Sequence, residues 1–162
     1  MKSPFATWKS VVLTAVLAVV FYLLGYSWIS RRQTGNGPWQ ADFSTNAAGI
    51  PEVRLSHPAR GISNVTVQFT DEKLAPSNTT GHVAFAKPKA KTPFCTIVYD
   101  DLMFQPGVVT LDCFGHLVEM TPNALGINGK AFPWTNGAAF SLVSSNKMSA
   151  EARKKLKGGY KN

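Results

Sequence analysis

Three residues near the middle of this 162-residue chain have side chains that can bind a soft metal ion. Cys113, His116 and Met120 occur together in the stretch CFGHLVEM. They would supply a thiolate, an imidazole and a thioether, which are ligand types that suit copper. A second imidazole would come from His57 or His82.

The same stretch also fits a turn between two strands. Gly115 would make the bend, and residues 117–120 (LVEM) would form the second strand. Side chains alternate between the two faces of a strand, so Leu117 and Glu119 would face one side and Val118 and Met120 the other. We favour the turn, and we therefore predict no catalytic residue, no metal ligand and no cofactor.

With the residues before it, QPGVVTLDC, the stretch resembles the ligand loop of blue copper proteins. In that family a Pro-Gly turn and a strand lead to Cys, His and Met ligands. The resemblance implies a copper ion on Cys113, His116 and Met120 and a role in electron transfer or metal transport. The chain departs from the family because 42 residues follow Met120, and because neither His57 nor His82 precedes an asparagine.

Residues 115–130, GHLVEMTPNALGINGK, are similar to a β-hairpin segment of type I signal peptidases. Those enzymes are also anchored by an N-terminal span. No Ser-Met pair follows the apolar N-terminal stretch of this chain, and Val108 stands where the lysine base of the family belongs. This resemblance therefore implies a degenerate β domain without catalytic residues.

The second cysteine of the chain is Cys95. A hairpin centred on Phe104 pairs residues whose numbers sum to 208, which places Cys95 opposite Cys113. Directly opposed Cβ atoms lie about 4.5–5.5 Å apart, near the reach of a disulfide. The pattern leaves two alternatives: a disulfide in an exported domain, or two buried thiols packed as small hydrophobic side chains.

The N-terminal region is the most apolar part of the chain. Residues 10–30 (SVVLTAVLAVVFYLLGYSWIS) carry no charge and follow a basic leader at 1–9. As a helix this stretch spans about 31 Å, close to the thickness of a hydrocarbon core. It is long for a signal peptide, and Trp28 with Ser30 makes a poor cleavage site. We predict an uncleaved transmembrane helix, with interface residues at its two ends: Trp8, Trp28, Arg31 and Arg32.

Charge is concentrated at the ends of the chain. The formal net charge is +8, but residues 147–162 contain six basic residues and one acid. Nucleic acid is therefore an unlikely partner, because the body of the chain lacks a basic cluster. A short basic leader favours a cytosolic N-terminus, so we expect a single-pass protein of the inner membrane with its domain exported. The basic tail would favour the opposite orientation if it bound anionic lipid.

Between a flexible linker at 31–38 (RRQTGNGP) and the basic tail, residues 39–146 contain short apolar or alternating runs separated by turn signals. This pattern predicts a mainly β fold: a small all-β sandwich or partly open barrel. Asn128-Gly129 predicts a type I′ turn from a strand ending at Ile127 to one starting at Lys130. We predict the strands at 52–56, 64–70, 82–86, 94–99, 108–114, 117–120, 125–127 and 140–143.

In the tail we predict a short helix from Ser149, as N-cap, to Lys157. The whole pattern predicts a single-pass, membrane-anchored β domain, and it favours a non-enzymatic binding or scaffolding component of an envelope assembly over an enzyme. Its partners would be the lipid bilayer and other membrane or envelope proteins. Trp39, Phe132 and Trp134 would either contact such a partner or pack in the core.

Overall fold

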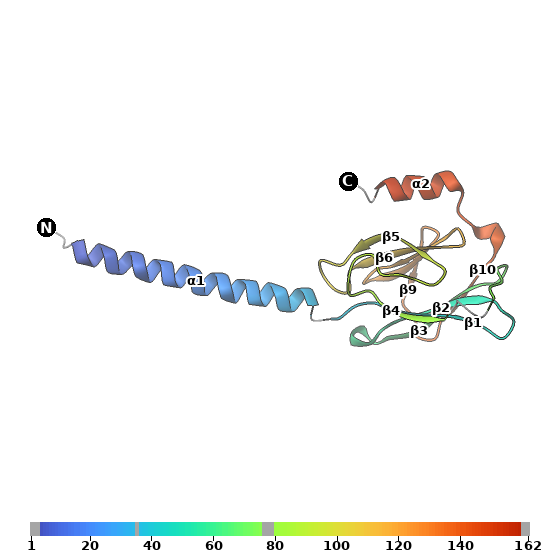
Figure 1. The fold of residues 1–162 in the computed structure, drawn as a ribbon, viewed down its shortest axis with the longest axis horizontal. Coiled ribbons are helices and arrows are strands. Elements are labelled where there is room, and N and C mark those ends of the chain that lie inside the picture. The colour runs from blue at the N-terminus through green and yellow to red at the C-terminus, as the bar shows by residue number, and fades with distance from the viewer. Residues whose placement is uncertain (1–3, 35, 76–79, 160–162) are drawn as a thin grey trace. The chain divides into compact units, whose positions relative to one another are not determined.

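A computed structural model describes the backbone of residues 4–34, 36–75 and 80–159, and the side chains of 8–29, 36–75 and 80–155. The chain divides into two compact units, residues 1–35 and residues 36–162. The first unit is a single helix and the second is the β domain (Figure 1).

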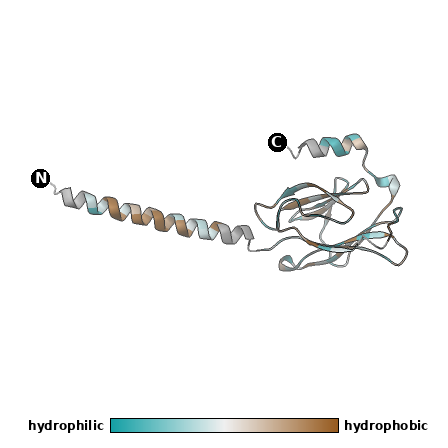
Figure 2. Ribbon diagram, viewed as in Figure 1, coloured by the Kyte–Doolittle hydropathy of each residue, from teal (hydrophilic) through white to brown (hydrophobic). Residues whose placement is uncertain are grey.

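Helix α1 (Pro4–Thr34) contains the apolar stretch. The segment Trp8–Ile29 is long and apolar enough to cross a membrane, by length and composition only, and Figure 2 shows its apolar residues along the helix. None of this segment is buried. The helix extends beyond the predicted 10–30 at both ends, and residues 31–34 of the predicted linker are helical. The reason is that RRQT contains neither glycine nor proline, the residues that interrupt helices most strongly. The side chains of Arg31 and Arg32 lie outside the described residues.

The β domain contains two five-stranded sheets. In the first sheet all neighbours are antiparallel except β10, which runs parallel to β3. Its strands, in spatial order, are β10 (Ala139–Leu142), β3 (Ile62–Phe69), β2 (Pro51–His57), β1 (Gln40–Thr45) and β4 (Gly81–Ala84). A short 3-10 helix, η1 (Pro58–Arg60), connects β2 to β3.

The second sheet is an antiparallel meander in chain order. Its strands are β5 (Thr96–Asp101), β6 (Val108–Cys113), β7 (His116–Met120), β8 (Ala124–Ile127) and β9 (Lys130–Pro133). Asn128 and Gly129 both have positive φ, and Ile127 pairs with Lys130, so the predicted two-residue turn is confirmed.

One hydrophobic core contains side chains from both sheets, including Phe43, Val67 and Phe69 from the first and Leu111, Met120 and Leu125 from the second. Two open sheets that share one core make a sandwich-like fold and not a closed barrel. The mainly β prediction is confirmed.

Strand β1 is absent from the sequence-based prediction. Its residues, QADFST, include Asp and Ser, which are depleted in strands. Nevertheless Ala41 and Phe43 alternate with half-buried neighbours and lie in the core, at 0% and 2% exposure. Strand β1 pairs with β2 on one side and with β4 on the other, so it lies inside the five-stranded sheet and not at its edge.

The two ends of the β domain differ in content. The entry end, where the chain enters the domain at Asn36, contains the β5–β6 loop (residues 102–107). The far end contains the β6–β7 and β8–β9 turns, η3 (Ser144–Asn146) and the start of α2 (Ala150–Gly159) (Figure 1). Ser149 Oγ accepts a hydrogen bond from the Ala152 N–H at 3.2 Å, as predicted for an N-cap.

Candidate functional site

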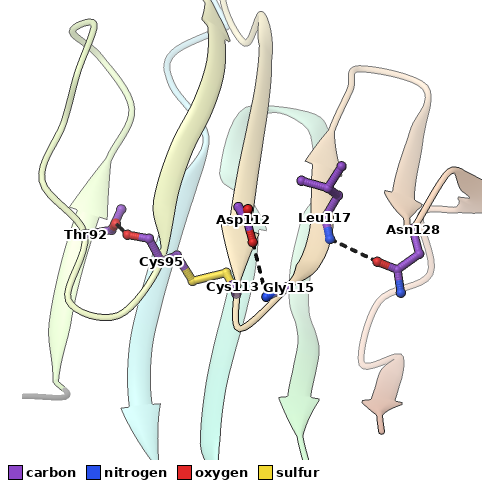
Figure 3. The surroundings of a disulfide bond; sticks show 7 residues. All are labelled: Thr92, Cys95, Asp112, Cys113, Gly115, Leu117 and Asn128. Atoms are coloured by element: carbon purple, nitrogen blue, oxygen red, sulfur yellow. Dashed lines mark hydrogen bonds between the residues drawn. A yellow bond between two sulfur atoms is a disulfide. The ribbon is translucent and has the colours of Figure 1, made fainter. Parts of the chain in front are cut away.

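The stretch CFGHLVEM forms the β6–β7 hairpin. Cys113 pairs with His116, and only Phe114 and Gly115 lie between them. Both turn residues have positive φ (54° and 90°), and the Asp112 side chain accepts a hydrogen bond from the Gly115 N–H at 3.2 Å (Figure 3). The predicted turn at Gly115 is therefore what the structure contains.

Cys95 and Cys113 form a disulfide with a Cα–Cα distance of 4.4 Å (Figure 3). The predicted register holds next to the bond, where Thr96 pairs with Asp112 and the numbers sum to 208. Beyond Ile97 an irregularity shifts the register by one residue, so the hairpin is not symmetric about Phe104. Both cysteines are buried, and the Thr92 hydroxyl donates to the carbonyl oxygen of Cys95.

The three candidate copper ligands do not converge. The Cys113 sulfur is bonded to Cys95, so the thiolate is not available while the disulfide is intact. Met120 lies in the core on the same face of β7 as His116 but four residues further along, about 13 Å away at about 3.3 Å per residue. Among the described residues, no group of three or more His, Cys, Asp or Glu side chains is placed to hold a metal ion.

The other two histidines lie elsewhere. His57 is fully buried at the entry end, where its Nε2 donates to the Gly37 carbonyl at 3.1 Å and its ring lies edge-on to Trp39. His82 lies on β4 and contacts Asp42 at 2.7 Å. Neither imidazole is therefore close to the far-end hairpin.

Buried His116 belongs to a polar network at the far end that is centred on half-buried Asn128. Asn128 Nδ2 donates to His116 Nδ1 at 3.1 Å and to the Asn146 carbonyl at 2.7 Å. Asn128 Oδ1 accepts a hydrogen bond from the Leu117 N–H at 2.9 Å, as Figure 3 shows. Because Nδ1 is an acceptor, the ring is neutral, with its proton on Nε2. Burial, and secondarily the charge of Lys147, lowers the pKa of His116; the nearby carboxylates of Glu72, Asp112 and Asp71 oppose this shift.

The segment that leads into the basic tail is fixed to this network. Lys147 forms an ion pair with Glu72 at 2.6 Å, and Arg153 forms one with Asp112 at 3.4 Å. The Met148 N–H donates to the Gly115 carbonyl at 3.3 Å. The tail therefore leaves from the far end of the domain, opposite the point at which the chain enters.

Among the hollows on the described part of the β domain, two lie at strand edges or turns. One, of about 530 Å³, lies along edge strand β5 and the loop before it and is lined by residues 89–92 and 95–100. The other, of about 460 Å³, lies between the β8–β9 turn, β10 and residues 146–148. The first combines Lys89 and Lys91 with Ile97 and Tyr99.

Of the three aromatic residues suggested as partner contacts, Trp39 lies in the core, and Phe132 and Trp134 are half-buried and pack against it. Trp39 is fully buried, stacks on Trp134 at 4.9 Å and donates from Nε1 to the Gly107 carbonyl at 3.1 Å. Trp134 Nε1 donates to the Thr121 carbonyl at 2.9 Å, and Phe132 packs on Phe140 at 5.1 Å. Their role is to hold the two sheets together.

Asn128 was predicted only as a turn residue, and its contact with His116 is not apparent in the sequence. The contact arises because two tight turns, one ending at His116 and one containing Asn128, lie side by side on neighbouring strands. The sequence offers one signal for this contact: an asparagine at a turn position that favours positive φ follows, after twelve residues, a histidine at the start of a strand.

The segment that resembles signal peptidases forms β7, β8 and the turn into β9. Val108, at the position of the family's lysine, is the first residue of β6. No protein-family model, no curated protein and no solved structure matches this chain.

Proposed function

We propose that this chain is a single-pass inner-membrane protein whose exported β domain binds or scaffolds other components of an envelope assembly. One observation carries the proposal: a long apolar helix precedes a disulfide-closed β domain in the same chain. Such a connection ties the position of the domain to the membrane and raises its effective concentration near membrane partners.

The composition of α1 supports the tether. Its apolar window has no polar face, and no residue of that window is buried by protein. A helix that is hydrophobic all round needs either a large protein core or lipid around it. Lipid is the solvent that fits a helix attached to a domain of this size.

The disulfide supports export. Stable disulfides persist in oxidising compartments such as the periplasm and are rare in the cytosol. Cys95, which directly precedes β5, and Cys113, the last residue of β6, form this bond. The basic leader, which favours a cytosolic N-terminus, is consistent with this orientation.

The residues that suggested chemistry have structural roles, which supports a binding function. Cys113 forms the disulfide, His116 is the acceptor for Asn128, and Met120 fills the core. The hollow along β5 and the exposed edge of that strand remain as surfaces for a polypeptide partner.

Thiol accessibility in intact cells tests the sidedness. The native chain should react with a membrane-impermeant maleimide only after reduction, because both cysteines are bonded. An Ala47→Cys variant adds an exposed thiol in the β1–β2 loop and should react in intact cells without reduction. Labelling of Ala47→Cys only after lysis would contradict export.

The size of the particle in mild detergent tests the scaffolding role. A component of an assembly should elute as a particle larger than a detergent-bound monomer of 17.6 kDa. Elution as a monomer under every mild extraction condition would contradict the scaffolding role while leaving the tether in place.

A further inference from the structure

We propose that the β5–β6 loop is a second membrane contact, with Met103 and Phe104 inserted into the interfacial region of the bilayer. This inference rests on the proposed tether through α1. It goes further in assigning a lipid-binding surface to the β domain itself.

Met103 and Phe104 are unusual in their exposure. Their exposed fractions are 69% and 57%. In the described part of the β domain, no other large hydrophobic side chain is exposed to this degree. A pair of adjacent apolar side chains on an otherwise well-buried domain indicates an interaction site.

The loop backbone is held in place while these side chains point outward. The Asp101 carboxylate accepts the Met103 N–H at 3.1 Å, and the Gly107 carbonyl accepts the Trp39 indole N–H at 3.1 Å. Gln105 Nε2 also donates to the Ala86 carbonyl at 3.5 Å. A loop that is already ordered loses little conformational entropy when it binds, which favours insertion.

The loop lies where the chain enters the domain. Asn36, the first residue of the β unit, donates from Nδ2 to the Gln105 carbonyl at 3.5 Å. The apolar window of α1 ends at Ile29, seven residues before Asn36. Even a fully extended connection of that length reaches only about 25 Å, so the loop stays within reach of the bilayer surface.

Two lysines beside the loop suit an anionic surface. Lys87 and Lys89 are exposed. The segment that bears them contacts the loop through the Ala86 carbonyl, and the Lys89 N–H donates to the Asp100 carboxylate near the end of β5 at 2.7 Å. Apolar side chains flanked by lysines are typical of surfaces that lie in the headgroup region of anionic membranes.

The test uses the full chain reconstituted into vesicles of phosphatidylcholine and phosphatidylglycerol. An environment-sensitive fluorophore is attached to Met103→Cys and, as a matched control, to Ala47→Cys at the far end, with the native disulfide left intact. We expect lipid-borne quenchers to cause a loss of fluorescence at position 103 and none at position 47. Equal quenching at both positions, or none at either, would overturn the inference.

Carbonate washing of the same vesicles separates this inference from the tether. Retained protein without quenching at position 103 overturns the membrane contact alone, and would leave Met103 and Phe104 to a protein partner. Protein released by the wash overturns both proposals.

For the lysines, Lys87→Gln/Lys89→Gln should abolish the extra quenching that phosphatidylglycerol causes, and an unchanged increase would overturn their assignment.

Discussion

Removing the disulfide should cost the β domain a large part of its stability. Cys95 and Cys113 are separated by 18 residues, and closing a loop of this length in the unfolded chain corresponds to about 3 kcal/mol in the chain-entropy model. Domains of this size are stable by only about 5–15 kcal/mol. The bond therefore accounts for a substantial fraction of the free energy of unfolding.

The measurement is urea unfolding of the full chain in detergent micelles, followed by the fluorescence of buried Trp39 and half-buried Trp134. For an m-value of about 2 kcal/mol/M, the midpoint should fall by about 1.5 M on reduction. The double variant Cys95→Ala/Cys113→Ala should fall at least as far, because it also loses core packing. Comparing it with the reduced native protein separates the bond from the packing.

An unchanged midpoint under reductant would refute this reasoning. It would mean that the β5–β6 pairing persists in the unfolded state, so that the bond removes no conformational freedom. It would also weaken the case for export, since the disulfide would then be dispensable for folding.

Three further predictions concern stability at the two ends of the domain. Because the pKa of His116 is lowered below the usual value of about 6.5, the unfolded chain binds this proton first as the pH falls. The contribution of His116 to the free energy of unfolding should be complete above about pH 6.5 and should decline below it by up to about 1.4 kcal/mol per pH unit. In urea titrations at several pH values, His116→Gln should reduce this slope. An equal slope in that variant would be evidence against the buried neutral ring. Gly107→Ala should destabilise the domain by several kcal/mol, because the new Cβ would lie 2.1 Å from the Asp101 carbonyl oxygen. Gly129→Ala is the matched control: it is also at positive φ but in open space, and it should cost about 1–2 kcal/mol. Equal melting temperatures for these two variants would contradict the close approach. Asn128→Ala should lower the free energy of unfolding by about 2–4 kcal/mol, because the buried His116 ring and the Leu117 N–H lose their hydrogen-bond partner and alanine is placed at positive φ. An effect below about 1 kcal/mol would contradict the network.

Local signals in the sequence predicted much of the fold. The length and uniform apolarity of residues 10–30 require no tertiary information, because they reflect the solvent around the helix. Tight turns are similarly local: Asn128, Gly129 and Gly115 adopt positive φ, which asparagine and glycine tolerate best, whereas Phe114 adopts it against the preference of its residue type. Counting along one hairpin gave the Cys95–Cys113 disulfide as one of two alternatives, and the count holds at the cysteines only because an irregularity between Ile97 and Tyr99 shifts the register of the strands next to the turn.

Features that depend on distant segments were not predictable. Strand β1 contains polar residues and exists because β2 and β4 pair with it on both sides. The contact of His116 with Asn128, and the ion pairs that hold residues 147–153 on the far end, join segments whose proximity is set only by the completed sheets.

The central claim is that α1 remains part of the mature chain and anchors the β domain in a membrane. The most direct test is the intact mass of the chain recovered from carbonate-washed membranes. The account predicts that the full chain of 17.6 kDa stays in the membrane pellet and is released only by detergent. A shorter product that begins after the apolar stretch and occurs in the soluble fraction would contradict it.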